Sequence, residues 1–108
     1  MLDNLSIFLL HVIHRIPRLE SQYTIMRFMG KAALLPDIIF GNLQSLVNDG
    51  FLEITKIEYG VKYYEITFKG KDWLDRHYSL KEISEYVDTI DSSGFFSKIL
   101  VDLENSKS

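Results

Sequence analysis

The chain has 108 residues, of which 46% are hydrophobic and 25% are charged, a composition typical of one globular domain with a single core. It contains no cysteine, which excludes a disulfide framework, a thiolate metal site and a cysteine nucleophile, and which fits the reducing cytoplasm that we expect. The net charge is −3, and since residues 1–76 carry nine basic and nine acidic side chains, the deficit falls on the C-terminal segment. The N-terminal region is therefore less basic than many dedicated DNA-binding domains.

The first apolar segment predicts a helix. Apolar residues recur from Leu5 to Ile16 at the spacing of one helical face, with Asp3 or Asn4 available as a cap and Pro17 to end the helix. Polar and charged residues interrupt this stretch, so we expect neither a signal peptide nor a membrane span. Two further apolar residues lie off the main face and widen the stripe, which predicts a second packing surface.

Two more helices are predicted, separated by a break. Thr24 is expected to cap a short helix that points Arg27 and Lys31 away from its apolar side. Pro36 suits the first position of a third helix, because its missing N–H would be unpaired there in any case. This helix is predicted over residues 36–48, and Gly50 ends it because glycine tolerates a left-handed conformation.

After this helix the apolar period changes to two. Residues 51–57 and 61–68 predict a β-hairpin, and residues 58–60 form its turn. The side chains that we expect to point inward are Leu52, Ile54, Tyr64, Ile66 and Phe68. Thr67 is then expected to begin a fourth helix that continues through Trp73 and Leu74.

The C-terminal segment predicts two amphipathic helices. Apolar residues recur from Leu80 to Ile90 and again from Phe95 to Leu103, on either side of a break at residues 92–94. We expect both helices to be buried against the first helix, within one subunit or between two. On this basis residues 78–104 are a dimerisation element of a homodimer, and residues 105–108 are a frayed end.

Two residue patterns indicate a known fold. They are Thr24-x-x-x-Phe28-Met29-x-x-Ala32-x-Leu34 followed by Ile39-x-x-x-Leu43-x-x-Leu46-x-x-x-Gly50-Phe51-Leu52, and Tyr64-x-Ile66-Thr67-x-x-Gly70-x-x-x-Leu74. Together they resemble the winged helix-turn-helix domain of the bacterial MarR and PadR transcriptional regulators, although Phe28 and Met29 replace the usual leucine and alanine. The resemblance implies an α+β, mostly helical fold over residues 1–77, with a three-helix core, a hairpin wing and a fourth helix.

The resemblance also implies a function, which is binding of double-stranded DNA with the third helix in the major groove and the wing on the backbone. The positions that would face the groove are Pro36, Asp37, Ile38, Gly41, Asn42 and Ser45, with Gln44 and Asn48 nearby. None of them is basic, although Lys and Arg supply most non-specific affinity for DNA. Asn42 and Gln44 are suited to adenine, and Asp37 would repel phosphate.

Basic side chains outside the third helix would frame it on DNA. They are Arg27 and Lys31 on the second helix, Arg15 and Arg18 near the end of the first, and Lys56 and Lys62 on the wing. A second hypothesis stays open because the third helix is uncharged apart from Asp37. In this hypothesis the domain is a protein interaction module whose contact includes Ile38 and Phe40.

No sequence feature indicates an enzyme. The chain has no glycine-rich phosphate loop and no serine nucleophile motif, so we expect neither catalysis nor a cofactor. His11 and His14 lie three residues apart but lack a third metal ligand nearby, and no metal site is expected. Asp88 and Asp91 fit a solvated helix face better than a catalytic pair.

Overall fold

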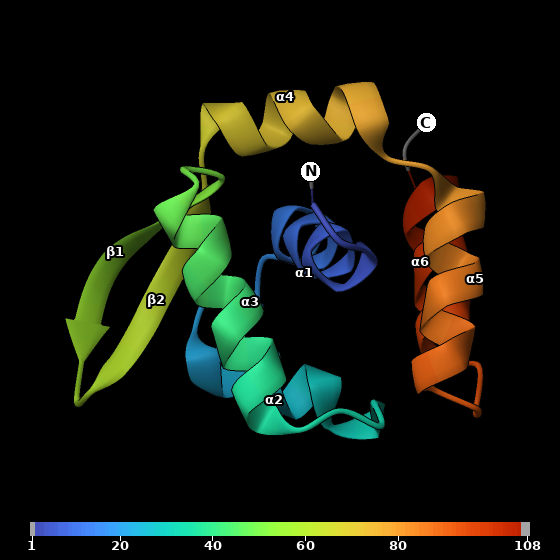
Figure 1. Ribbon diagram of the computed structural model, residues 1–108, viewed down its shortest axis with the longest axis horizontal. Helices are drawn as coiled ribbons and strands as arrows, with labels where there is room; N and C mark the ends of the chain where they lie inside the picture. Colours follow the sequence, from blue (N-terminus) through green and yellow to red (C-terminus); the bar gives the residue numbers. More distant parts are fainter. Residues whose placement is uncertain (1, 107–108) are drawn as a thin grey trace.

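The computed structural model describes residues 2–106 and has α1 (Asn4–Arg15) at its centre, surrounded by the other helices (Figure 1). Asp3 caps this helix, since its Oδ1 accepts a hydrogen bond from the Ser6 backbone N–H at 2.8 Å. The buried residues of α1 occupy almost its whole circumference: Leu5, Ser6, Phe8, Leu9, Leu10, His11, Val12 and Ile13. The second packing surface predicted for this helix is therefore covered within the same chain.

A short helix and a longer one come next. They are α2 (Gln22–Phe28), extended by the 3-10 turn η1 (Met29–Lys31), and α3 (Pro36–Asn48), whose bounds agree with the sequence prediction. The predicted cap of α2 is wrong, because the cap is Ser21 and not Thr24. Thr24 instead completes a capping box: its backbone N–H donates to Ser21 Oγ at 3.1 Å, and its own Oγ1 accepts from the Ser21 N–H at 3.2 Å.

The hairpin consists of β1 (Leu52–Glu58) and β2 (Val61–Ile66), which pair antiparallel. Its turn has two residues, Tyr59 and Gly60, with φ angles of 52° and 78°. Positive φ at both turn positions matches the right-handed twist of the strands. The pairing register shifts at Thr55, which forms a bulge and changes which face the following side chains occupy.

One face of the hairpin packs on the core. Leu52 and Tyr64 are buried and Ile54 and Ile66 are half-buried, as predicted. The prediction for Phe68 is wrong, because 82% of this side chain is exposed. Phe68 is the first residue of a helix and not the last of a strand, so the alternation of β2 does not extend to it.

The segment between α1 and α2 pairs with the edge of β2 that β1 leaves free. Ser21 forms an isolated antiparallel bridge with Tyr63, and the Tyr64 N–H donates to the Glu20 carbonyl at 2.6 Å. The Lys62 N–H donates to Gln22 Oε1 at 3.1 Å. These three contacts fix β2 against the start of α2, so the hairpin has a set position beside the helices.

Three helices complete the chain: α4 (Phe68–His77), α5 (Leu80–Ile90) and α6 (Phe95–Asn105). Thr67 caps α4 as predicted, accepting a hydrogen bond from the Gly70 N–H at 3.1 Å. In Figure 1, α4 crosses one end of the molecule, and α5 and α6 lie side by side against α1. The described chain is thus mostly helical, with one two-stranded antiparallel sheet.

The C-terminal helices belong to the same core as α1 and α2. Phe96 is fully buried, and its ring centroid lies 5.2 Å from that of Phe8 and 5.4 Å from that of Phe28. The apolar faces that suggested a homodimer are therefore occupied within the chain. Dimerisation stays a prediction, but the apolar faces no longer argue for it.

Asp91 is not on a solvated helix face, contrary to the sequence prediction, because only 5% of it is exposed. Its Oδ1 accepts hydrogen bonds from the Ser93 N–H and hydroxyl, and its Oδ2 accepts from the Phe96 N–H. The Ser93 hydroxyl contributes most to a pKa of Asp91 below its ordinary value, and the backbone N–H groups add to this effect. The carboxylate therefore organises the turn between α5 and α6.

The end of α6 is tied to α1. Arg15 Nη2 donates to the Leu103 carbonyl at 2.9 Å and contacts Ser106 Oγ at 3.3 Å. Asn105 is the last residue of α6, whereas residues 107–108 of the expected frayed end lie outside the described residues. Within residues 2–106, no helix has the length and apolar character needed to cross a membrane.

Candidate nucleic-acid interface

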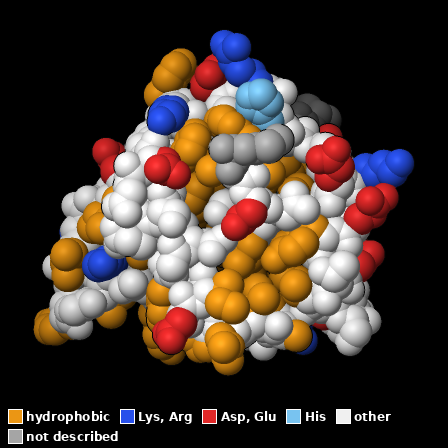
Figure 2. Space-filling model, in the orientation of Figure 1, with side chains coloured by type: hydrophobic (Ala, Val, Ile, Leu, Met, Phe, Trp, Pro, Cys, Tyr) orange, Lys and Arg blue, Asp and Glu red, His pale blue; other side chains and the backbone are white. Residues whose placement is uncertain are grey.

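One face of α3 is open to solvent. Its exposed residues are Pro36, Asp37, Ile38, Phe40, Gly41, Gln44, Ser45 and Asn48. The helices α4, α5 and α6 lie on other sides of α1 and leave this face uncovered (Figure 1). Figure 2 views the molecule in the same orientation, and the basic side chains on this face are few and separated. The face therefore offers polar and apolar groups but little positive charge.

Asp37 lies in the first turn of α3, where a carboxylate stabilises the positive end of the helix dipole. The same carboxylate lowers the attraction of this helix end for phosphate. The backbone N–H groups at the start of α3 are therefore not sufficient to bind a DNA phosphate beside Asp37.

Asn42 is half-buried and turned toward α1. Its Nδ2 donates to Asp3 Oδ1 at 3.0 Å and to Ser6 Oγ at 3.0 Å. These hydrogen bonds join the middle of α3 to the beginning of α1. They occupy the amide that the sequence assigned to base recognition.

Gln44 joins α3 to the hairpin. Its Nε2 donates to Asn48 Oδ1 at 2.9 Å, and Lys62 Nζ donates to its Oε1 at 3.5 Å. An amide that can read a base and a cation that can bind phosphate thus lie next to each other. We call the exposed residues Asp37, Ile38, Gly41, Gln44 and Ser45, together with Lys62, the α3–wing surface.

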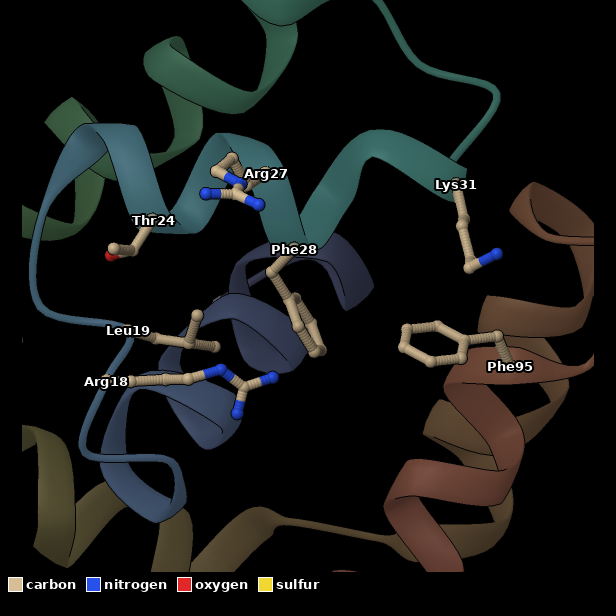
Figure 3. A pocket seen from close by; sticks show the side chains of 7 residues that line it. All are labelled: Arg18, Leu19, Thr24, Arg27, Phe28, Lys31 and Phe95. Atoms are coloured by element: carbon tan, nitrogen blue, oxygen red, sulfur yellow. The ribbon is translucent and has the colours of Figure 1, made fainter.

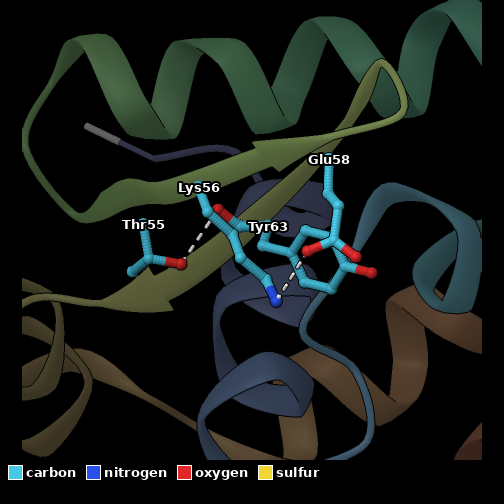
Figure 4. A network of polar contacts seen from close by, with 4 residues as sticks. All are labelled: Thr55, Lys56, Glu58 and Tyr63. Carbon is cyan, nitrogen blue, oxygen red and sulfur yellow. Dashed lines mark hydrogen bonds and ion pairs between the residues drawn. The ribbon is translucent and has the colours of Figure 1, made fainter.

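The other wing lysine is placed differently (Figure 4). Lys56 Nζ lies 3.3 Å from Glu58 Oε2 and 4.4 Å from the centroid of the Tyr63 ring. Lys56 is paired with Tyr63 across the hairpin, whereas Lys62 is paired with Ile57. Because adjacent residues of a strand point to opposite faces, Lys56 and Lys62 lie on opposite faces of the hairpin.

The two basic residues of the second helical segment have different neighbours: Arg27 lies beside Tyr23 of its own helix, and Lys31 lies beside Phe95 of α6. Arg27 is exposed and its guanidinium carbon lies 5.8 Å from the centroid of the Tyr23 ring, while Lys31 Nζ lies 5.2 Å from that of Phe95. Both line a cavity to which Arg18 also contributes (Figure 3). Of the predicted cations, the structure therefore brings Lys62 to Gln44 of α3, whereas Arg27 lies on α2 and Lys31 at the end of η1.

Sequence reasoning missed that Phe95 contacts Lys31 and that Arg18 lines the same cavity as Arg27 and Lys31. Tyr23 and Arg27 are four residues apart, a spacing that places side chains together on a helix, so this contact could have been predicted. No local signal reveals the contact of Phe95 with Lys31, because it depends on how α6 packs on the core.

His11 has a packing role beside Tyr78. Their rings stack with centroids 4.0 Å apart and an interplanar angle of 9°. Burial, followed by the negative charge of Glu104, raises the pKa of Tyr78 to about 12, and Arg15 opposes this shift. Among the described residues, no three or more His, Cys, Asp or Glu side chains gather in a way that could hold a metal ion.

No protein-family model matches the sequence, and comparisons with curated proteins and with solved structures give no match. The chain's own residues and geometry are therefore the basis for inferring its function.

Proposed function

We propose that the chain binds double-stranded DNA as a winged helix-turn-helix protein and acts as a transcriptional regulator. The observation that carries this proposal is the α3–wing surface, where an open helix face lies beside a hairpin and Gln44 contacts Lys62. In helix-turn-helix proteins the second helix of the motif enters the major groove. Lys62 would then contact a phosphate on the flank of the groove that α3 enters.

The α3–wing surface has groups that can distinguish bases. Both hydrogen bonds of the Gln44 amide, to Asn48 and Lys62, are exposed to solvent, so the amide can exchange them for hydrogen bonds to adenine. Ile38 can contact the thymine methyl group. Gly41 allows the backbone of α3 to approach a base closely, because it has no side chain and no other group lies within 4 Å of the position that a Cβ would occupy. These groups favour sites that contain A·T base pairs.

Salt dependence tests the proposal. If Lys62, which contacts Gln44 of α3, binds one phosphate, raising the salt concentration from about 50 to about 200 mM weakens binding about 3.5-fold, and about 40-fold if Arg27 and Lys31 each bind a phosphate as well. Fluorescence anisotropy of a labelled duplex pool would measure this. Lys62→Gln is expected to lower the salt slope by about one, and the matched control Lys81→Gln, an exposed lysine on α5, should not. Absent or salt-insensitive binding would contradict the proposal.

A second candidate function is a protein interaction module. The start of α3 exposes apolar side chains, with Leu35 69%, Ile38 44% and Phe40 36% exposed. Figure 2 also shows hydrophobic side chains gathered between α3 and α5. Exposed apolar patches often mark protein contacts.

Sedimentation velocity separates the two candidates. If α3 forms a protein contact between copies of the chain, Ile38→Ser abolishes self-association and leaves DNA binding absent or unaltered. If α3 reads DNA, the same substitution weakens duplex binding and leaves the sedimentation coefficient unchanged.

A further inference from the structure

An apolar surface lies between α3 and α5, where Figure 2 shows hydrophobic side chains gathered. On α3, Ile38 is 44% exposed and lies one turn before Asn42, so both residues occupy the same side of the helix. On α5, the half-buried Tyr86 lies one turn before Ile90 and shares a side with it. The contacts of Asn42 and Ile90 therefore indicate where the two sides point.

Two contacts connect these sides. At one end, the Ala33 N–H donates to the Ile90 carbonyl at 2.7 Å and ties the loop before α3 to the end of α5. At the other end, Asn42 Nδ2 donates to Asp3 Oδ1 at 3.0 Å, while burial, followed by the negative charge of Asp3, raises the pKa of Tyr86. Asp3 thus lies close to both helices, and the two sides border the same area. The apolar residues between the two connections, which we call the α3–α5 surface, are Ala33, Leu34, Ile38, Tyr86 and Ile90.

The charged groups beside the α3–α5 surface are acidic. Asp3 lies at one end of it and is exposed, and Glu82, which is also exposed, lies one turn before Tyr86. Within residues 2–106, neither carboxylate takes part in an ion pair. Lys31 belongs to the turn before this surface, but its Nζ lies 5.2 Å from the centroid of the Phe95 ring on α6. The two carboxylates are therefore available to the cations of a partner.

The backbone and the charge of this surface select its occupant. Helices α3 and α5 satisfy their backbone hydrogen bonds internally, so they offer no strand edge on which an extended peptide could pair. A helix satisfies its own backbone and can lay an apolar stripe against side chains. A second copy of the chain in a two-fold contact would bring like-charged carboxylates together. We infer that the α3–α5 surface binds an amphipathic helix of a partner protein in which Lys or Arg flanks the apolar stripe.

The α3–α5 surface gives a partner to the second candidate function, on which this inference rests, and it does not require DNA binding. Ile38 belongs to both the α3–α5 surface and the α3–wing surface. A bound helix and a bound duplex would therefore compete for the start of α3. Tyr86 and Glu82, by contrast, lie outside the α3–wing surface and separate the two kinds of binding.

Selection from a phage-displayed library of helical peptides on the full chain tests the inference. The library varies the apolar and the charged positions of a helix of about 18 residues, which is five turns. The selected peptides are expected to carry apolar residues at i, i+3, i+4 and i+7, with an excess of Lys and Arg beside them. A library that yields no binding peptide, or peptides without this excess of Lys and Arg, would overturn the inference.

Substitutions locate the peptide, with fluorescence anisotropy of a selected peptide as the measurement. Ile38→Ser should raise its dissociation constant about fivefold or more, and the matched control Val101→Ser, on α6 and 45% exposed, should not. Glu82→Gln should raise it about two- to fivefold, unlike Glu85→Gln on another side of α5. Asp3→Asn removes a charge but keeps a cap for α1, and it should also weaken binding. Unaltered binding in any of these three variants, or equal losses in the controls, would contradict the inference.

Duplex binding keeps the two proposals apart. Glu82→Gln should weaken peptide binding and leave duplex binding unchanged or stronger, because it removes a negative charge outside the α3–wing surface. If no peptide binds while Lys62→Gln lowers the salt slope of duplex binding, the partner inference is wrong and the DNA proposal stands. Peptide binding without duplex binding gives the opposite result.

Discussion

Replacing Phe96 by alanine tests whether the C-terminal helices belong to the core of a single chain. The side chain is fully buried and its ring lies within 5.6 Å of the rings of Phe8, Phe28 and Phe95, measured between centroids. Removing a phenylalanine from such a site costs about 3–5 kcal/mol, from lost burial and the cavity left behind. This is a large fraction of the roughly 5–15 kcal/mol that stabilises a typical domain.

Urea denaturation followed by circular dichroism gives the free energy of unfolding by linear extrapolation. Val101→Ala is the matched control, because Val101 lies on the same helix with 45% of its side chain exposed, and a change within about 0.5 kcal/mol is expected. If Phe96→Ala is too unstable to fold, Phe96→Leu keeps part of the burial and should show a smaller loss.

Unfolding at several protein concentrations shows whether the contacts of Phe96 lie within one chain or between two. The midpoint of unfolding should stay the same over a tenfold range of concentration, because the contacts of Phe96 lie within one chain. A loss below about 1 kcal/mol for Phe96→Ala, or a midpoint that rises with concentration, would refute the described packing.

Three further predictions concern local contacts. Gly70→Ala should lower the free energy of unfolding by about 1–3 kcal/mol, because the new Cβ would clash with the Phe51 carbonyl oxygen. Gly41→Ala, with open space around it, should raise the free energy of unfolding by about 0.5–1 kcal/mol, and the reverse order in urea denaturation would contradict this. Thr67→Val removes the cap of α4 and should lower the free energy of unfolding by about 1–2 kcal/mol, whereas Thr67→Ser should keep most of the wild-type stability. Equal stabilities of the two variants would contradict the role of the cap. The pKa of Tyr78 is raised from 10.0 to about 12, so its contribution to the free energy of unfolding should be fully present below pH 10 and be lost as the pH rises toward 12. Tyr78→Phe should remove this part of the alkaline decline, and an identical pH profile in both proteins would be evidence against it.

Local patterns in the sequence predict much of the fold. The bounds of α3 follow from Pro36 and Gly50, and the start of α4 follows from Thr67, because each of these residues satisfies or permits a specific backbone conformation at a helix end. The predicted cap of α2 lies three residues too late, because Ser21 and Thr24 both suit a cap and only the reciprocal hydrogen bonds decide between them.

Features that depend on long-range packing could not be read in the same way. Asn42 lies at the border of the exposed face of α3, and it turns inward because Asp3 and Ser6 of the α1 region supply acceptors. The apolar stripes of α1 and α6 indicate that both helices need a partner, but not that each is the partner of the other within one chain. The cavity lined by Arg18, Arg27, Lys31 and Phe95 could not be predicted for the same reason, because these residues come from distant segments.

The most direct test of DNA binding is to map the contact by nuclear magnetic resonance. Titration of the ¹⁵N-labelled chain with a duplex selected from a random library should shift the backbone amide signals of residues 37–48 in α3 and of Lys62 in the wing. The signals of α5, which lies away from the α3–wing surface, should stay in place (Figure 1). Failure of the library to yield a bound duplex, or shifts confined to α5 and α6, would contradict the proposal that α3 reads DNA.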